Sequence, residues 1–297
     1  MNRLTSNIRG CVAAISIALN TTLAAIPILF IAILKLIVPV AAWRKICSNL
    51  LNKFVEFWVH CNDIWLPAPQ NIVWQNMDPE DLNVDQSYLI TSNHQSWADI
   101  FMVQHLLNGR APQMKFFLKQ ELIWVPVIGL CWWALDFPFM KRYKKSYLKK
   151  HPEKKGADQQ TTIKACRKFR SIPTSVYNFL EGTRFTPEKH KRQQSPYQHL
   201  LKPKAGGIGL VLSALDDRIN SILDITLFYR DAIPGFWDLL CGRNGNVTII
   251  IEQRKIPTTL LNRDYSADSR FRTELLNWVN GIWQEKDELL EEMAKTT

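Results

Sequence analysis

The stretch SYLITSNHQSWADIFMVQHLL, residues 87–107, decides the fold. Its first part, residues 87–91, is rich in β-branched and aromatic side chains and predicts a strand, whereas residues 97–108 have the composition of a helix. The polar residues between these segments are of the kind that ends a strand and caps a helix. The stretch therefore predicts a strand, a turn and a helix in direct succession, with His94 in the turn and Asp99 in the first turn of the helix.

The alternation of strands and helices continues along the chain. Further strand-like segments are residues 72–75, 115–118, 174–180, 222–229 and 247–252. Segments with helical periodicity or composition are residues 43–66, 119–134, 158–170, 205–216 and 269–293. Such alternation indicates an α/β fold with a mixed, largely parallel sheet covered by helices. At 297 residues the chain is long enough for one large domain.

The N-terminal region is strongly apolar. Residues 11–34 contain no charged side chain, and this run is longer than the roughly 20 residues that cross a bilayer core. The residues that interrupt it are Asn20, Thr21, Thr22 and Pro27. The pattern predicts a membrane-anchoring helix or a re-entrant hairpin over residues 1–42, followed by a folded domain over residues 43–297. A cleaved signal peptide or a buried core helix is the alternative.

The net charge of +10 is unevenly distributed, because residues 141–155 carry eight Lys or Arg side chains and one Glu. Beside a membrane anchor such a cluster fits anionic lipid headgroups or a phosphorylated substrate. A solvated loop or a nucleic-acid contact has the same composition. The six scattered cysteines form no C-x-x-C pair, which argues against a zinc site or a disulfide framework and favours a reducing, cytoplasmic compartment.

The segment LIWVPVIGLCWWALDFPF, residues 122–139, carries a single charged residue, Asp136. A buried helix and strand in the core would have this composition. Two adjacent tryptophans, a proline and a glycine equally fit a segment that lines an acyl-binding tunnel or lies at a membrane interface.

The spacing of His94 and Asp99 suits a general base. On one continuous helix, residues five apart lie about 140° apart round the axis, but a histidine in the preceding turn can reach a carboxylate in the first helical turn. A carboxylate that holds one ring nitrogen fixes the tautomer and stabilises the imidazolium formed on proton uptake. Such a histidine can remove a proton near neutral pH. The alternative is two polar residues in an ordinary strand-to-helix turn.

A second polar turn, EGTR at residues 181–184, follows the strand predicted at residues 174–180. Parallel α/β sheets place their ligand-binding groups in turns that follow strands. Gly182 permits a tight turn, and Arg184 offers a forked donor suited to phosphate. A solvated turn with an incidental acid and base is the alternative.

Together, NHQSWAD at residues 93–99 and the EGTR turn resemble the PlsC-like glycerolipid acyltransferases, which include the 1-acylglycerol-3-phosphate acyltransferases. The resemblance covers roughly residues 85–230. The residues that match family motifs are His94 and Asp99 in the first, Arg142 of FPFMKR in the second, Glu181, Gly182, Thr183 and Arg184 in the third, and Lys119 between the first two. Leu180 replaces a proline found in many members, and ILDITLFY replaces a proline-containing fourth motif. Both features are similar to the branch of YihG-type enzymes and lysocardiolipin acyltransferases.

The resemblance implies a membrane-bound enzyme whose catalytic residues are His94 and Asp99. The substrate-binding residues that it implies are Glu181, Gly182, Thr183, Arg184, Arg142 and Lys119. His94 would take the proton from the sn-2 hydroxyl of a lysophospholipid, 1-acylglycerol-3-phosphate, as that hydroxyl attacks the thioester of acyl-CoA or acyl-carrier protein to give phosphatidate.

The resemblance also implies no metal and no cofactor apart from the acyl donor, and partners limited to membrane lipids and the two substrates. Nucleic acid is not expected. The acyltransferase domain, residues 43–297, would lie on the cytoplasmic face of a membrane, which in a bacterium is the inner membrane.

Other functions remain open at this point. The acceptor could be another lysophospholipid, such as lysophosphatidylglycerol or lysocardiolipin. A lipid hydrolase would carry an identifiable nucleophile, and the sequence contains no G-x-S-x-G elbow. A catalytically silent membrane scaffold would need neither His94 nor Asp99. A basic nucleic-acid-binding protein would leave the apolar N-terminus and the EGTR turn unexplained.

Overall fold

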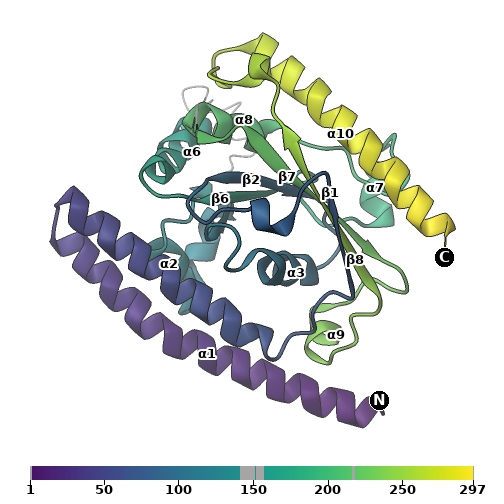
Figure 1. The fold of residues 1–297 in the computed structure, drawn as a ribbon, viewed down its shortest axis with the longest axis horizontal. Coiled ribbons are helices and arrows are strands. Elements are labelled where there is room, and N and C mark those ends of the chain that lie inside the picture. Colours follow the sequence, from purple (N-terminus) through teal and green to yellow (C-terminus); the bar gives the residue numbers. More distant parts are fainter. Residues whose placement is uncertain (1, 141–150, 152–156, 216–217, 297) are drawn as a thin grey trace.

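The computed structural model describes residues 2–140, 151, 157–215 and 218–296. Its centre is a six-stranded sheet with the strand order β1-β8-β7-β2-β6-β3 (Figure 1). The strands are β1 (Asn71–Gln75), β2 (Tyr88–Ser92), β3 (Met114–Phe116), β6 (Ser175–Phe179), β7 (Ser221–Tyr229) and β8 (Val247–Lys255). β7 and β8 are antiparallel, whereas the other neighbouring strands are parallel. The expected mixed, largely parallel sheet is confirmed.

Helices cover both faces of this sheet (Figure 1). The longer helices are α1 (Arg3–Ile37), α2 (Ala41–Asp63), α3 (Ala98–Leu107), α6 (Ala157–Arg167), α8 (Gly206–Leu215) and α10 (Ser269–Lys295). The shorter ones are α4 (Ile128–Ala134), α7 (Pro187–Gln193) and α9 (Phe236–Leu240). The five helices predicted at residues 43–66, 97–108, 158–170, 205–216 and 269–293 therefore all form, within a few residues of the expected bounds.

The central strand β2 contributes to two hydrophobic cores, one on each face of the sheet. Leu89 packs into a buried cluster with residues of α8 and α10. Its neighbours Tyr88 and Ile90 pack into a second cluster with residues of α3. Successive side chains of a strand point to opposite faces of the sheet. All five residues of β2 are buried as a result.

The N-terminal run forms one continuous helix, α1, without a break at its polar residues or at Pro27. The Asn20 side chain donates to Asn62 Oδ1 at 2.7 Å, and Trp58 Nε1 donates to Thr21 Oγ1 at 3.2 Å. These polar groups therefore find partners on α2, with which α1 forms a hairpin closed at residues 38–40 (Figure 1). The polar residues therefore do not mark a re-entrant hairpin within residues 1–42.

The helix predicted over residues 119–134 is wrong in part. Residues 120–124 form a 3-10 turn, and α4 begins only at Ile128. Pro126 restricts the residue before it to extended conformations, and Val127 has a positive φ of 63°. The strand predicted at 115–118 is likewise divided, because Leu118 and Lys119 form β4 (Leu118–Lys119), which pairs with β5 (Phe139–Met140) in a separate two-stranded sheet.

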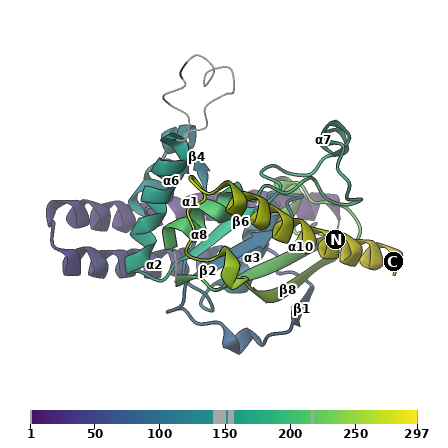
Figure 2. The same cartoon turned by 90° about the horizontal axis from the view of Figure 1, so that it is seen from above.

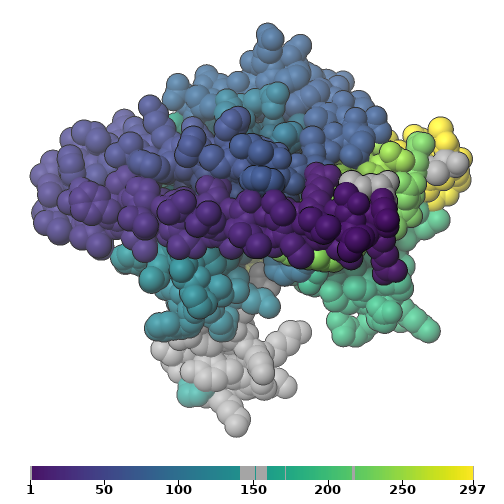
Figure 3. Space-filling model, turned by 90° about the horizontal axis from the view of Figure 1, so that it is seen from below, coloured from purple at the N-terminus to yellow at the C-terminus, as the bar shows by residue number. Residues whose placement is uncertain are grey.

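The outward surface of α1 is apolar. Leu19, Ile26 and Phe30 are 57, 66 and 61% exposed, and α1 is long and apolar enough to cross a membrane. Figure 3 shows α1 running across one whole face of the molecule, and Figure 2 shows the closed end of the α1–α2 hairpin extending beyond the sheet. α1 also contacts α4 and α9, so it lies along the body of the protein.

Candidate active site

The turn that carries His94 is fixed by its neighbour Asn93. The buried Asn93 amide donates to Leu227 O at 2.8 Å and accepts from Leu227 N at 2.9 Å. Asn93 therefore ties the chain beyond the carboxyl end of β2 to the neighbouring strand β7. This is the edge of a parallel sheet at which α/β proteins place ligands.

His94 and Asp99 meet as their spacing predicts. Asp99 lies in the first turn of α3, and its Oδ2 atom is 2.9 Å from His94 Nδ1. The same oxygen accepts from the backbone N–H groups of Gln95 and Ser96 at 2.7 and 2.9 Å. An ionised carboxylate is acceptor-only, so His94 Nδ1 carries the proton in this bond. The lone pair of His94 then lies on Nε2, where it can accept a proton.

Phe179 holds the imidazole ring from one side. Its ring stacks on that of His94 with 3.7 Å between centroids. Phe179 is the last residue of β6, the strand beside β2. The His94 side chain remains 13% exposed, whereas Asp99 is fully buried. The imidazole of His94 therefore has one accessible edge and is held from the other side.

The two sequence motifs come together through Glu181. Its Oε1 accepts from His94 N at 2.7 Å, and its Oε2 accepts from Leu201 N at 3.1 Å. Phe185 N also donates to His94 O at 2.7 Å. The Glu181 side chain is buried and both of its oxygens accept from the backbone, so it fixes the His94 turn from behind.

Burial raises the pKa of the Glu181 carboxyl from 4.5 to about 8, against the lowering effect of the two backbone N–H groups. The protonated acid is therefore favoured in the fold, and it keeps acceptor capacity for the backbone. The pKa of Glu181 is higher in the folded chain than in the unfolded chain, so the stability that this carboxyl contributes is fully present below about pH 4.5. That contribution is lost as the pH rises to about 8.

We expect the free energy of unfolding to fall by a few kcal/mol over this pH window through Glu181. The Glu181→Gln variant cannot titrate, so it should lack that component. Thermal unfolding of both proteins over the same pH series measures the difference. An identical pH dependence in the two proteins would contradict the prediction.

The rest of the EGTR turn is also ordered. Gly182 has a positive φ of 66°, which favours glycine, and Thr183 Oγ1 accepts from Lys189 Nζ at 2.9 Å. The exposed Arg184 guanidinium lies over the Trp97 ring, 4.8 Å from its centroid. Trp97 precedes α3, so Arg184 lies beside the turn that carries His94.

Two lysines, Lys189 and Lys204, also lie at the EGTR turn, and together with Arg184 they form a cationic corner. Lys189 of α7 also donates to Arg184 O at 2.8 Å. A side chain built on Gly182 would lie 3.1 Å from Lys204 Nζ, so Lys204 lies against the turn. The basic, glycine-rich run LLKPKAGGIGL at residues 200–210 marks Lys204 in the sequence, whereas nothing local marks Lys189.

Two predicted binding residues are not brought to this corner. Lys119 is exposed in the small β4–β5 sheet, and within the part of the chain that the structure describes it has no hydrogen bond or ion pair with the motif residues. Arg142 lies outside the described residues, as does most of the basic run 141–155.

Tyr229 is a site residue that sequence reasoning missed. Its buried hydroxyl donates to Asp99 Oδ1 at 2.6 Å, and burial together with the Asp99 charge raises the pKa of Tyr229 well above its usual value. Tyr229 therefore stays a donor. Its place at the end of β7 would be a usable signal only once the pairing of β7 with β2 is known.

We expect Tyr229→Phe to lower kcat/KM about ten-fold, because a hydrogen bond to a charged group is worth about 1.5–3 kcal/mol. The phenylalanine ring keeps most of the volume of the tyrosine and removes only the donor to Asp99 Oδ1. Tyr177→Phe is the matched control, because the buried Tyr177 hydroxyl forms its 2.7 Å hydrogen bond with Ser92 Oγ instead of with Asp99. Equal kcat/KM values for both variants would contradict the role of Tyr229.

An apolar cavity of about 180 Å³ begins beside the motif. Trp97, Ile100 and Phe101 line it next to the His94 turn, and further lining side chains come from α1, α2 and α4 and from Gln113 and Phe116. The segment 122–139 contributes Ile128, Cys131, Trp132, Leu135 and Phe137. The apolar segment 122–139 therefore lines the cavity and also packs in the core.

The residues 75–229 match the sequence profile of the Acyltransferase family. Among curated proteins, the chain is 29% identical over 192 residues to 1-acyl-sn-glycerol-3-phosphate acyltransferase gamma of Mus musculus, covering 61% of this chain and 46% of the relative. It is 27% identical over 225 residues to the delta protein of the same organism, covering 71% and 54%. The chain thus spans about half the length of these relatives.

The fold is similar to the crystal structure of the 1-acyl-sn-glycerophosphate acyltransferase PlsC from Thermotoga maritima, with a TM-score of 0.54 and 16% identity over 96% of this chain and 98% of the other. That likeness concerns the fold alone. The family profile covers more than half of the chain, including both motifs that meet at His94. The chain therefore belongs to the Acyltransferase family.

Proposed function

We propose that this protein transfers a fatty acyl group from a thioester, acyl-CoA or acyl-carrier protein, to the free sn-2 hydroxyl of a lysophospholipid. The acceptor is 1-acylglycerol-3-phosphate and the product is phosphatidate. The observation that carries the proposal is the arrangement around Trp97. Trp97 meets the Arg184 guanidinium and also lines the apolar cavity, and the His94 turn lies next to it.

In this reaction His94 is the general base. Its Nε2 atom takes the proton of the acceptor hydroxyl while the hydroxyl oxygen attacks the thioester carbonyl carbon. The tetrahedral oxyanion collapses, the carbon–sulfur bond breaks, and the leaving thiolate takes the proton back from the imidazolium. Asp99 holds the ring in the required tautomer through the 2.9 Å bond to Nδ1. Glu181 acts as a positioning residue, because both of its oxygens are used by the backbone.

The cationic corner suits the phosphate of the acceptor. Arg184, Lys189 and Lys204 gather at the EGTR turn, and a guanidinium can bind phosphate oxygens in pairs. The apolar cavity suits an acyl chain, which would be removed from water there. Holding both substrates beside one base lowers the barrier by positioning.

We expect Arg184→Ala to raise the KM for the acceptor about ten-fold and to leave kcat nearly unchanged. A phosphate contact that is present before the reaction contributes equally to the ground state and the transition state, and a charge-assisted bond is worth about 1.5–3 kcal/mol. The exposed Arg192 of α7 provides the matched control, Arg192→Ala. A fall in kcat with unchanged KM would remove Arg184 from phosphate binding.

The apolar outer face of α1 supports the proposal that the enzyme lies on a membrane. The exposed α1 side chains Leu19, Ile26 and Phe30 are joined by Leu130 and Trp133 of α4, which are 51 and 46% exposed. Burying such a surface in lipid is favourable by the hydrophobic effect. The catalytic domain then lies on the cytoplasmic face, which for a bacterial cell is that of the inner membrane.

The test is acyl transfer from a radiolabelled long-chain acyl-CoA to 1-acylglycerol-3-phosphate by the purified protein. Labelled phosphatidate is the expected product, and its formation must depend on the acceptor. Labelled fatty acid released without acceptor would instead indicate a hydrolase. Parallel reactions with lysophosphatidylglycerol, and with acyl-carrier protein as donor, identify the preferred acceptor and donor. No transfer to any of these acceptors from either donor would overturn the proposal.

A further inference from the structure

A groove of the described structure lies away from the His94 turn. It has a volume of about 870 Å³ and is bounded by one face of α2 and by the segments that precede the strands of the sheet. Ser87 immediately precedes β2, and Gln113 immediately precedes β3. His94 follows the opposite, carboxyl end of β2, whose five residues alone span about 15 Å. The groove is therefore remote from His94, although Gln113 lines both the groove and the apolar cavity.

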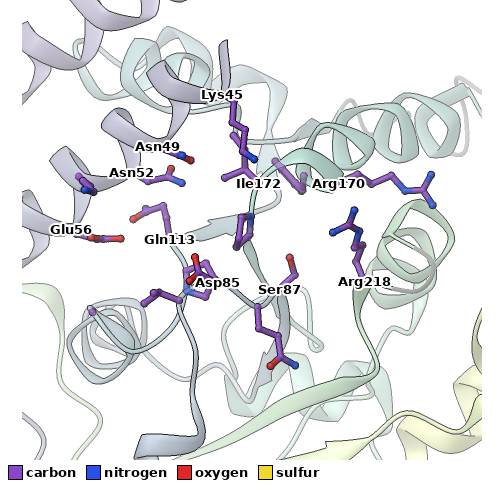
Figure 4. Close-up of a pocket in the computed structure, with 17 residues that line it drawn as sticks. Lys45, Asn49, Asn52, Glu56, Asp85, Ser87, Gln113, Arg170, Ile172 and Arg218 are labelled. Carbon is purple, nitrogen blue, oxygen red and sulfur yellow. The ribbon is translucent and has the colours of Figure 1, made fainter. Parts of the chain in front are cut away.

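The walls of the groove carry an excess of positive charge. Its cationic residues are Lys45, Lys53, Arg170 and Arg218, and its acidic residues are Glu56 and Asp85. Burial raises the pKa of Glu56, and the nearby Lys53 charge opposes that rise. Figure 4 shows Lys45 reaching into the groove from α2 and Arg218 on the opposite wall. Cations on two walls of a concave surface attract an anion more strongly than the same charges on a convex one.

Neutral hydrogen-bonding groups lie between these cations. Asn49 and Asn52 of α2 line the groove together with Gln113 and Ser87 (Figure 4). Amide and hydroxyl side chains both donate and accept hydrogen bonds. They suit the hydroxyl groups of a small polyol better than a bare inorganic ion. The groove therefore matches a ligand that combines a phosphate group with hydroxyl groups.

The position of the groove indicates the source of such a ligand. On α2, the exposed apolar residues Ile46, Leu50 and Phe57 are 58, 43 and 64% exposed. At about 100° per residue they lie roughly a quarter of a turn round the helix from Lys45 and Asn49. The apolar strip of α2 thus borders the groove. A lipid whose chains lie along that strip would present its headgroup to the cations.

We propose that this groove binds the headgroup of an anionic phospholipid with a hydroxylated headgroup, of the phosphatidylglycerol type, as a second lipid site distinct from the acceptor site. Lys45 and Arg218 bind the phosphodiester from opposite walls, and the amides of α2 meet the headgroup hydroxyls. The contact adds to the membrane binding by the apolar helices proposed above, and it orients the protein on an anionic bilayer.

The test compares Lys45→Gln/Arg218→Gln with Arg270→Gln/Lys295→Gln. The second pair also removes one arginine and one lysine, but from α10, across the molecule from α2 (Figure 1). Co-sedimentation of the full-length protein is measured with vesicles of phosphatidylcholine alone and of phosphatidylcholine mixed with phosphatidylglycerol. Each basic residue near an anionic surface contributes about a five-fold gain in affinity. We expect the groove variant to lose about ten-fold or more on the mixed vesicles and nothing on phosphatidylcholine, and the α10 variant to lose at most about two-fold.

Equal losses by the two variants would show a diffuse charge effect and would overturn the proposal. A second arm titrates the wild-type protein with inorganic phosphate and, separately, with water-soluble short-chain phosphatidylglycerol. Binding of phosphate as tight as that of the short-chain lipid would identify free phosphate as the ligand and equally overturn it. Circular dichroism melting checks each variant, and Lys53→Gln/Arg218→Gln replaces the first pair should that pair fail to fold.

Acyl transfer in neutral detergent micelles separates this inference from the proposed function. The groove variant should keep the kcat of the wild type there, because neither substituted residue touches the catalytic turn. An inactive wild type with lipid selectivity through the groove would refute the proposed function alone. An active wild type whose groove variant binds anionic vesicles normally would refute the groove site alone.

Discussion

His94→Ala is expected to lower kcat by about a thousand-fold or more. Positioned general bases contribute about 10²–10⁴-fold, and no other histidine ring lies against Asp99 among the described residues. The fold should persist, because the His94 backbone makes the bonds to Glu181 and Phe185 and keeps them in the variant. Initial rates with saturating acyl-CoA and lysophosphatidate measure the effect.

A second histidine–aspartate pair provides the control for this substitution. His105 Nδ1 lies 3.2 Å from Asp63 Oδ1, between α3 and α2. His105→Ala also removes an imidazole that contacts an aspartate, but from the last turn of α3 and not from the turn that carries His94. Its kcat should stay within about two-fold of the wild type, as is usual for a substitution outside the reacting groups. Normal activity in His94→Ala would end the general-base mechanism.

Asp99→Asn is expected to cost about as much, for a different reason. The amide keeps the volume of the carboxylate, but only its oxygen can accept hydrogen bonds. It therefore cannot satisfy the four donors that surround both oxygens of Asp99. If its NH₂ group faces His94, the imidazole must accept on Nδ1 and carry its proton on Nε2, which then cannot act as the base. In a Ser–His–Asp protease the corresponding change lowers kcat by about 10⁴-fold, and we expect a loss of about 10³–10⁴-fold here.

Nitrogen-15 chemical shifts of the His94 ring distinguish this explanation from general damage. The wild type should show the Nδ1-protonated tautomer and Asp99→Asn the Nε2-protonated one. Asp63→Asn, at the control pair, should change neither the His94 tautomer nor kcat. Full activity in Asp99→Asn, or a loss without a change of tautomer, would contradict the assigned role of Asp99.

The sequence predicted the elements of the fold well where their patterns are local. Short runs rich in β-branched and aromatic residues located the strands, and the closing helix at 269–293 follows from its helical spacing, realised in α10 (Ser269–Lys295). The segment 119–134 went wrong because Pro126 overrides the helical composition on both sides of it. The polar residues of α1 suggested a break, yet partners on α2 satisfy them.

The candidate site also contains contacts that the sequence predicted and contacts that it did not. The spacing of His94 and Asp99, together with the turn before α3, sufficed to predict their contact, which the structure has at 2.9 Å. Glu181 was placed near the substrate, whereas in the fold it is buried against the backbone of His94 and Leu201. Burial depends on what other segments cover a side chain, and the sequence of a turn does not contain that information.

The sequence by itself determined the order of the elements, the two polar turns that follow strands, and the residue types able to move a proton or bind phosphate. These features depend on interactions within a few residues, where periodicity and turn chemistry act. Only the tertiary structure decided that Tyr229 and Glu181 support the turn of His94 and Asp99, that Lys189 and Lys204 join Arg184, and that a cationic groove opens beside α2. The physical reason is that each of these results from strand pairing and helix packing between segments distant in the chain, whose register is set by the assembled core.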